Sequence, residues 1–133
     1  MDKMKILVVD DESRMRKLVS DFLTRKGYAV IEAADGVEAV DTFMENKDIA
    51  LIILDVMMPR MDGLSATLKI REEKNIPIIL VSAKTEDSDK IIGLNMGADD
   101  YITKPFNPLE LVARVKSNLR RYISLGNFKQ ESL

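Results

Sequence analysis

The chain has 133 residues, of which 46% are hydrophobic and 32% charged, and its net charge is −2. These values fit one globular domain and give no indication of nucleic-acid or membrane binding. The chain has no cysteine, which excludes disulfides and thiolate chemistry, and no histidine, which excludes imidazole catalysis and imidazole metal ligands. No apolar run approaches the roughly 20 residues that span a bilayer, and acids follow the first apolar run at once, so a cytoplasmic protein without a signal peptide is expected.

Five short apolar runs are predicted as strands. They are Lys5–Val9, Ala29–Ala33, Ala50–Leu54, Pro77–Val81 and Tyr101–Thr103. Three of these runs contain the continuous stretches ILVV, LIIL and IPIILV, rather than alternating apolar and polar residues. Continuous apolar strands are typical of a parallel sheet that is covered by helices on both faces.

Helical patterns alternate with these strands. The first has apolar residues at intervals of three and four and ends before Gly27; its apolar positions are Met15, Leu18, Val19, Phe22 and Leu23. The next three are predicted over Gly36–Glu45, about Leu64–Glu72 and about Ser88–Met96. The last begins with Asn107 as N-cap and Pro108 in the first turn, and it directs Leu111, Val115 and Leu119 inward. The alternation predicts an α/β fold with a doubly wound parallel sheet, and the polar residues 122–133 are expected to form a tail or the start of a linker.

Polar side chains follow the strands where each one ends. Asp10 and Asp11 follow the first strand, Asp55 the third, Ser82 the fourth and Lys104 the fifth. Because parallel strands end at one edge of a sheet, these groups are expected to meet there. Three carboxylates without histidine or cysteine favour Mg²⁺, and Lys104 and Ser82 suit a phosphoryl group. The pattern predicts a phosphoryl-transfer site with a carboxylate nucleophile.

Each of these residues alone also has an ordinary structural explanation. Asp10 and Asp11 could cap the first helix, and Asp55 could be a turn residue. Ser82 could be a loop hydroxyl and Lys104 a solvated surface side chain. The combination at one edge of the sheet favours the functional interpretation.

The motifs VVDDE, LDVMMPRMDG, VSA and DDYITKPF resemble the receiver domain of bacterial two-component response regulators. The resemblance covers residues 3–121, and the spacing between the motifs is kept. It implies a flavodoxin-like fold, in which a five-stranded parallel sheet of order 2-1-3-4-5 lies between two layers formed by five helices. Residues 1–121 would be the receiver domain.

The resemblance also implies a role for each matching residue. Asp55 would accept a phosphoryl group from a sensor histidine kinase. Mg²⁺ would be held by Asp11, Asp55 and the backbone carbonyl of Met57, with Asp10 acting through water. Lys104 would contact the phosphoryl oxygens. Slow self-dephosphorylation, rather than turnover as an enzyme, would be expected.

The resemblance extends to three further features. Ser82 would bind the attached phosphoryl group, although many family members have threonine there. Tyr101 resembles the aromatic residue that moves inward on activation; on its own it could be an ordinary aromatic residue of the sheet. The Lys104–Pro105 bond resembles one that is cis in the family.

The segment from Lys90 to Arg121 looks like the OmpR/PhoB type of DNA-binding regulator. That type would form a homodimer on phosphorylation, through the fourth helix, fifth strand and fifth helix. Ile91, Leu94 and Val112 would pack across the interface, and the candidate ion pairs between subunits are Lys90–Glu110, Asp100–Arg114 and Asp99–Arg121. The same charges could simply form a solvated face. A winged-helix domain is expected to follow and to make any DNA contact; alternatively, the chain is a stand-alone receiver that acts by protein–protein interaction.

Other classes of function fit less well. A phosphatase of the haloacid dehalogenase type would need a second aspartate two residues after the nucleophile, where this chain has Met57. VVDDESR lacks the glycines of a dinucleotide-binding turn, and the chain has no phosphate-binding GxxxxGK[ST] motif. An interaction module without phosphorylation would not need the three carboxylates and Lys104 together.

Overall fold

The computed structural model describes residues 3–83, 92–95 and 97–132, with side chains placed as far as residue 124. The elements are β1 (Lys5–Val9), α1 (Ser13–Arg25), β2 (Ala29–Ala33), α2 (Gly36–Glu45), β3 (Ile49–Asp55), α3 (Gly63–Arg71), β4 (Ile78–Ser82), β5 (Asp100–Thr103) and α5 (Pro108–Ser132). Residues 92–95 are helical, and the rest of the helix predicted over residues 88–96 lies outside the described residues. Gly97, which follows that predicted helix, is in a turn.

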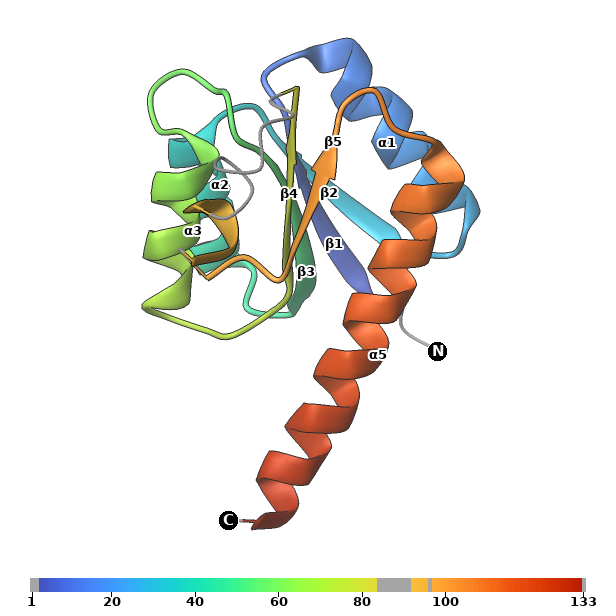
Figure 1. The fold of residues 1–133 in the computed structure, drawn as a ribbon, viewed down its shortest axis with the longest axis vertical. Coiled ribbons are helices and arrows are strands. Elements are labelled where there is room, and N and C mark those ends of the chain that lie inside the picture. Colours follow the sequence, from blue (N-terminus) through green and yellow to red (C-terminus); the bar gives the residue numbers. More distant parts are fainter. Residues whose placement is uncertain (1–2, 84–91, 96, 133) are drawn as a thin grey trace.

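The strands form one parallel sheet in the order β2-β1-β3-β4-β5. This confirms the doubly wound α/β fold. Helices α1 and α5 cover one face of the sheet, and α2 and α3 cover the other (Figure 1). The chain changes direction across the sheet beside β1 and β3, and in folds of this kind ligands bind where the neighbouring strands end.

Two apolar cores, one on each face, hold the strands in place. Successive residues of a strand point to opposite faces, so Leu7 and Ile52 belong to the core under α2 and α3, whereas Ile6 and Ile53 belong to the core under α1 and α5. All four are at most 4% exposed. The central strands are therefore packed on both sides, which fixes the backbone from which the site residues project.

Strand β3 and helix α5 are among the elements that extend beyond their predicted bounds. Strand β3 runs from Ile49 to Asp55, so Asp55 is still held in the sheet, paired with Val81 of β4. Helix α5 begins as predicted, with the Asn107 side chain accepting a hydrogen bond from the Leu109 N–H at 2.8 Å. It continues to Ser132 and projects well past the sheet (Figure 1), although residues 122–132 lack the apolar stripe that indicates a packed helix. None of the helices within the described residues is both long and apolar enough to cross a membrane.

Candidate functional site

Three carboxylates meet at the edge where β1 and β3 end. β1 and β3 run in register, with Val9 beside Leu54, so the residues that follow them emerge together. Carboxylate oxygens of Asp10, Asp11 and Asp55 lie within 4.8 Å of one another. Asp10 and Asp55 are buried and Asp11 is exposed, so the cluster opens to solvent on the side of Asp11. The structure thus brings together the carboxylates that the strand ends predict.

Lys104 lies between two of these carboxylates. Its Nζ is 3.1 Å from Asp10 Oδ2 and 3.5 Å from Asp55 Oδ2. Burial of Lys104 favours the neutral amine, but the hydrogen bond to Asp10 and the charges of Asp10 and Asp55 outweigh this and raise its pKa. Lys104 is therefore a fixed positive charge within the site, and not a solvated surface lysine.

Asp10 orders the turn before α1 while it also faces the site. Its Oδ1 accepts a hydrogen bond from the Glu12 N–H at 2.9 Å, and its Oδ2 binds Lys104. The N-cap residue of α1 is Glu12, and no side chain caps that helix. Arg16, in the first turns of α1, donates to the Asp10 carbonyl at 2.7 Å and to Glu32 at 3.0 Å. Asp10 therefore orders the turn before α1 but does not cap the helix.

Asp55 is held at the end of β3 in an environment that disfavours its charge. The residue is 5% exposed, and its Oδ1 accepts a hydrogen bond from the Met57 N–H at 3.3 Å. Burial, followed by repulsion from Asp10, raises the pKa of Asp55 to about 6, although Lys104 and the Met57 N–H favour the charged form. A carboxylate with a raised pKa beside other carboxylates gains from any cation that binds among them.

The donor set fits Mg²⁺. Three carboxylate oxygens offer the hard ligands that this ion prefers, and the exposed side of the cluster leaves room for the waters that Mg²⁺ usually retains. One cation, Lys104, faces two of the three carboxylates, so the site still has an excess of negative charge. An open hollow beside Asp11, lined also by Met57, Pro59 and Asp62, connects the cluster with solvent.

Ser82 and Tyr101 are both buried. Ser82 ends β4 and is fully buried, and its carbonyl accepts a hydrogen bond from the Lys104 N–H at 2.8 Å, which ties the end of β4 to the residue that carries the cation. Tyr101 is 4% exposed and belongs to the core under α2 and α3. The Lys104–Pro105 bond is cis, as the resemblance implied.

The apolar residues implied for a dimer face differ in how far they are exposed. Lys90 and Ile91 lie outside the described residues. Leu94 is 38% exposed, whereas Val112 is 5% exposed and packs into the core of its own chain. Val112 therefore has little surface left with which to contact a second subunit.

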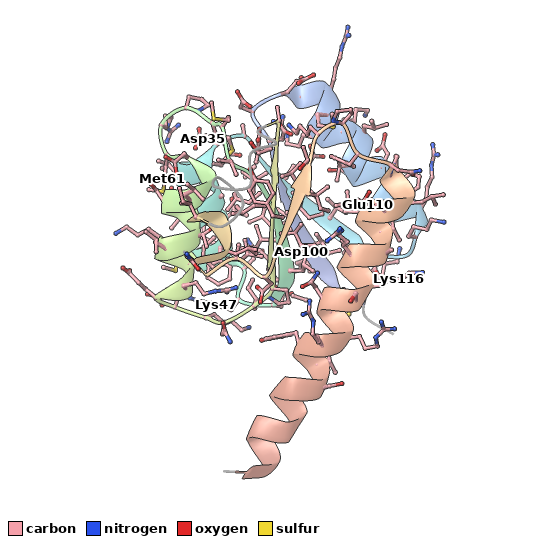
Figure 2. The ribbon with its side chains drawn as sticks, in the orientation of Figure 1. Asp35, Lys47, Met61, Asp100, Glu110 and Lys116 are labelled. Atoms are coloured by element: carbon pink, nitrogen blue, oxygen red, sulfur yellow. The ribbon has the colours of Figure 1, made fainter. Side chains whose placement is uncertain are left out.

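The charged residues of this face that the structure describes have partners within the chain. Arg114 pairs with Asp100 at 2.6 Å and with Glu110 at 3.4 Å, and Arg121 donates to Asn118 at 2.8 Å. Asp99 pairs with Arg71 at 2.5 Å and accepts a hydrogen bond from the Ile78 N–H. Figure 2 shows Asp100 at the start of β5 and Glu110 on the neighbouring helix. An ion pair between subunits would have to share or replace these contacts.

Comparison with known proteins decides the family. Residues 6–116 match the family described as the response regulator receiver domain. The chain belongs to this family. The receiver is 51% identical over 118 residues to the regulatory protein VanRc of Enterococcus gallinarum, covering 89% of this chain and 51% of that protein. It is 49% identical over 117 residues to the transcriptional regulatory protein SrrA of Staphylococcus aureus, covering 88% of this chain and 48% of that protein.

Solved structures agree with this result. The receiver superimposes on a two-component response regulator from Clostridium difficile with a TM-score of 0.85 at 34% identity, covering 90% of this chain and 98% of that one. It matches a chain of the CheX–CheY–BeF3–Mg complex from Borrelia burgdorferi with a TM-score of 0.82 at 33% identity, covering 86% of this chain and 87% of that one. The fold and the two-component family are thereby confirmed.

The receiver spans about half the length of the curated relatives that it matches. Its relatives at about 50% identity, VanRc and SrrA, are OmpR/PhoB-family regulators, as the resemblance implied.

Sequence reasoning missed two arginines that lie around the site. Arg16 holds the backbone of Asp10, and Arg60, in the loop between β3 and α3, pairs with Asp35 at 3.3 Å. Neither has a spacing that distinguishes it from a surface arginine. Their partners come from other elements, so only the tertiary structure reveals them.

Proposed function

We propose that this receiver is a phosphorylation switch in which Asp55 is the phosphoryl acceptor. One observation carries the proposal: Lys104 lies within 3.5 Å of both Asp10 and Asp55, in a cluster whose three carboxylates can share one cation. With a cation bound, such an arrangement would hold two positive centres beside Asp55, and it would suit a group that arrives with negatively charged oxygens.

In the proposed reaction an oxygen of Asp55 attacks the phosphorus of a phosphorylated histidine on a sensor kinase. A bond forms between phosphorus and the Asp55 oxygen, the bond between phosphorus and the histidine nitrogen breaks, and the nitrogen retains the electron pair. Lys104 would neutralise the phosphoryl oxygens as they approach, and Ser82 would donate a hydrogen bond to them. When bound by Asp11, Asp55, the Met57 carbonyl and, through water, Asp10, Mg²⁺ would supply further charge neutralisation.

The raised pKa of Asp55 is compatible with this role. A pKa of about 6 leaves the carboxylate mainly ionised at neutral pH, and bound Mg²⁺ would bring that raised pKa down again. An ionised carboxylate beside Asp10 is only partly neutralised by Lys104, and after phosphoryl transfer the phosphoryl oxygens would carry the negative charge within reach of Lys104.

The partners of the whole protein follow the same proposal. A sensor histidine kinase would donate the phosphoryl group, and the face made by residues 92–95, β5 and α5 would change on phosphorylation to form a homodimer. By analogy with VanRc and SrrA, about half of each of which the receiver matches, a further domain would bind DNA. A receiver that acts only through protein contacts is the alternative. In either case the protein would be a phosphoryl acceptor and not a turnover enzyme. It would act in the cytoplasm.

Acetyl phosphate tests the acceptor directly. Incubation of the protein with acetyl phosphate and Mg²⁺ is expected to add the mass of one phosphoryl group, with acetate as leaving group. Chelation of Mg²⁺ with EDTA should abolish the addition. The matched variants are Asp55→Asn, which should not be labelled, and Asp62→Asn, which keeps its position as N-cap of α3 and should be labelled normally. Labelling of the Asp55→Asn variant at the parent level would contradict the proposal.

A further inference from the structure

The loop that carries the Met57 carbonyl rests on the beginning of α2. This loop comprises residues 56–62 and connects β3 with α3. Gly36 is the first residue of α2, and a Cβ atom placed there would lie 2.7 Å from both the backbone carbon and the Cβ of Met61, and nearer still to the Met61 carbonyl oxygen. Two of these three atoms belong to the backbone and cannot move away by a change of rotamer. Glycine at position 36 therefore allows an approach of the loop that any other residue would prevent.

Asp35 joins the loop to the same helix through a second contact. Its Oδ1 caps α2 by accepting a hydrogen bond from the Glu38 N–H at 2.8 Å, and its Oδ2 lies 3.3 Å from a guanidinium nitrogen of Arg60. Asp35 is 7% exposed, so the cap and the ion pair together hold it in one orientation. Figure 2 shows Asp35 and Met61 side by side at this end of α2.

Arg60 has a backbone conformation that is rare for arginine and depends on contacts with its surroundings. Its φ is +68°, in the left-handed region that residues other than glycine, asparagine and aspartate rarely adopt. A conformation of this kind persists where the surrounding structure determines it. Two contacts restrain Arg60 here. Its side chain pairs with Asp35, and the next residue, Met61, lies against Gly36.

The other end of the loop is fixed to the sheet. The Val56 N–H donates to the Val81 carbonyl and the Gly63 N–H donates to the Val56 carbonyl, each at 3.0 Å. Met57 therefore lies between an anchor on the sheet and an anchor on α2. The direction of its carbonyl depends on both anchors, because a displacement of Met61 must be taken up by the few residues between them.

We propose that Gly36 and the Asp35–Arg60 ion pair are positioning residues for magnesium: the start of α2 seats the loop so that the Met57 carbonyl is held for the ion. This inference rests on the proposed function, since it presupposes the Mg²⁺ site of Asp11, Asp55 and Met57. It goes beyond that function by making α2, which contributes no ligand, a determinant of Mg²⁺ affinity.

The direct test is Gly36→Ala, with Mg²⁺ affinity measured by calorimetric titration. The added Cβ should displace Met61 and weaken Mg²⁺ binding about tenfold, the lower end of what loss of a ligand-supporting contact does in metalloproteins. The control is Gly27→Ala. A Cβ at Gly27 meets nothing within 4 Å, but the φ of +98° makes alanine strained there, so this control should lose stability and keep the parent Mg²⁺ affinity.

A second pair of variants separates positioning from simple electrostatics. Arg60→Gln removes a positive charge from the loop, so an effect of charge alone would strengthen Mg²⁺ binding. Loss of the anchor should instead weaken it about twofold to fivefold, as expected for a half-exposed ion pair. Arg60→Lys keeps the cation and should restore most of the parent affinity.

The outcomes distinguish a failure of the proposed Mg²⁺ site from a failure of the positioning role of Gly36 and Arg60. If the parent protein does not bind Mg²⁺, the proposed function is wrong and this inference is wrong with it. If the parent binds Mg²⁺ and Gly36→Ala binds it equally well, only the positioning role is overturned. If Gly36→Ala does not fold, the Arg60 pair decides: Mg²⁺ binding by Arg60→Gln that is equal to or tighter than that of the parent overturns the inference, and weaker binding that Arg60→Lys restores supports it.

Discussion

Asp55 occupies a position that favours reaction over stability. Its carboxylate ends a buried strand beside Asp10, so burial and like charge raise its pKa to about 6. The unfolded chain has an ordinary aspartate pKa near 4. Between these two values the folded protein binds more protons than the unfolded chain, so this group makes stability fall as the pH rises from about 4 to about 6. Above about pH 6 the ionised Asp55 destabilises the folded protein to its full extent.

Replacement of Asp55 by asparagine should therefore stabilise the protein in the absence of Mg²⁺. At pH 7.5 we expect the free energy of unfolding in urea to increase by on the order of 1–2 kcal/mol, since partial solvent screening reduces the effect of the pKa shift. At pH 4 the gain should largely vanish, because Asp55 of the parent is then protonated in the folded state. Asp21→Asn, at an exposed position of α1, is the control and should change stability little at either pH. A loss of stability at pH 7.5 on Asp55→Asn would contradict this account of Asp55.

Lys104 should lower the pKa of Asp55, whereas burial and Asp10 raise it. Because its charge favours the ionised form of Asp55, Lys104→Gln should raise the pKa of Asp55 above its value of about 6. A pH titration of the Asp55 carboxyl carbon by NMR measures this shift, and Lys69→Gln, at an exposed position of α3, provides the control. An unchanged or lower pKa in Lys104→Gln would show that Lys104 does not act on Asp55.

The cluster of site residues was predictable because it depends on a simple rule. Parallel strands end at one edge of a sheet, so Asp10, Asp55 and Lys104 could be placed together from the positions of three apolar runs. The supporting residues were not predictable in this way. The contact of Gly36 with Met61 and the left-handed backbone of Arg60 depend on how a loop meets a helix from another part of the chain.

Helices and strands position the site through a few close backbone contacts. Gly63 begins α3, and a Cβ there would lie 2.9 Å from the Val56 Cα and also collide with the Asp55 carbonyl oxygen. Helix α3 thus starts directly against the end of β3, and this contact helps to fix the backbone at Asp55.

Gly63→Ala should force α3 away from β3. We expect a loss of roughly 1–3 kcal/mol in the free energy of unfolding, the usual range for an added methyl group in a closely packed region. Urea denaturation measures this loss, and Ser65→Ala, at an exposed position of the same helix, should stay within about 0.5 kcal/mol of the parent. A Gly63→Ala protein as stable as the parent would show that α3 can shift without strain.

Element bounds were predicted best where an apolar pattern meets a turn residue. Helix α2 has the bounds expected from its sequence, with Asp35 as its N-cap. The continuation of α5 to Ser132 was not predicted, since a helix that leaves the core carries no apolar stripe to reveal it. Asp100 of β5 and Arg114 of α5, predicted as an ion pair between subunits, pair within one chain in this structure, and their pairing across a dimer stays a prediction.

In the molecule as a whole, the proposed switch must change the face formed by residues 92–95, β5 and α5. Beryllofluoride mimics an attached phosphoryl group, and with Mg²⁺ it should shift the protein from monomer towards dimer in sedimentation or light-scattering measurements. Leu94→Arg should prevent the shift, because it places a charge on an exposed apolar position of that face. Leu18→Arg alters a more exposed leucine on α1 and should dimerise normally. Dimerisation of the Leu94→Arg variant at parent concentrations would exclude this face as the interface.

The measurement that tests the central claim most directly is chemical mapping of the phosphorylated residue. The protein is treated with acetyl phosphate and Mg²⁺, and borohydride then reduces the acyl phosphate to an alcohol that peptide mass spectrometry locates. We predict reduction at Asp55 alone, dependent on Mg²⁺ and strongly decreased in Lys104→Gln. Reduction at Asp10 or Asp11 in the parent protein, or no acyl phosphate at any residue, would contradict the account.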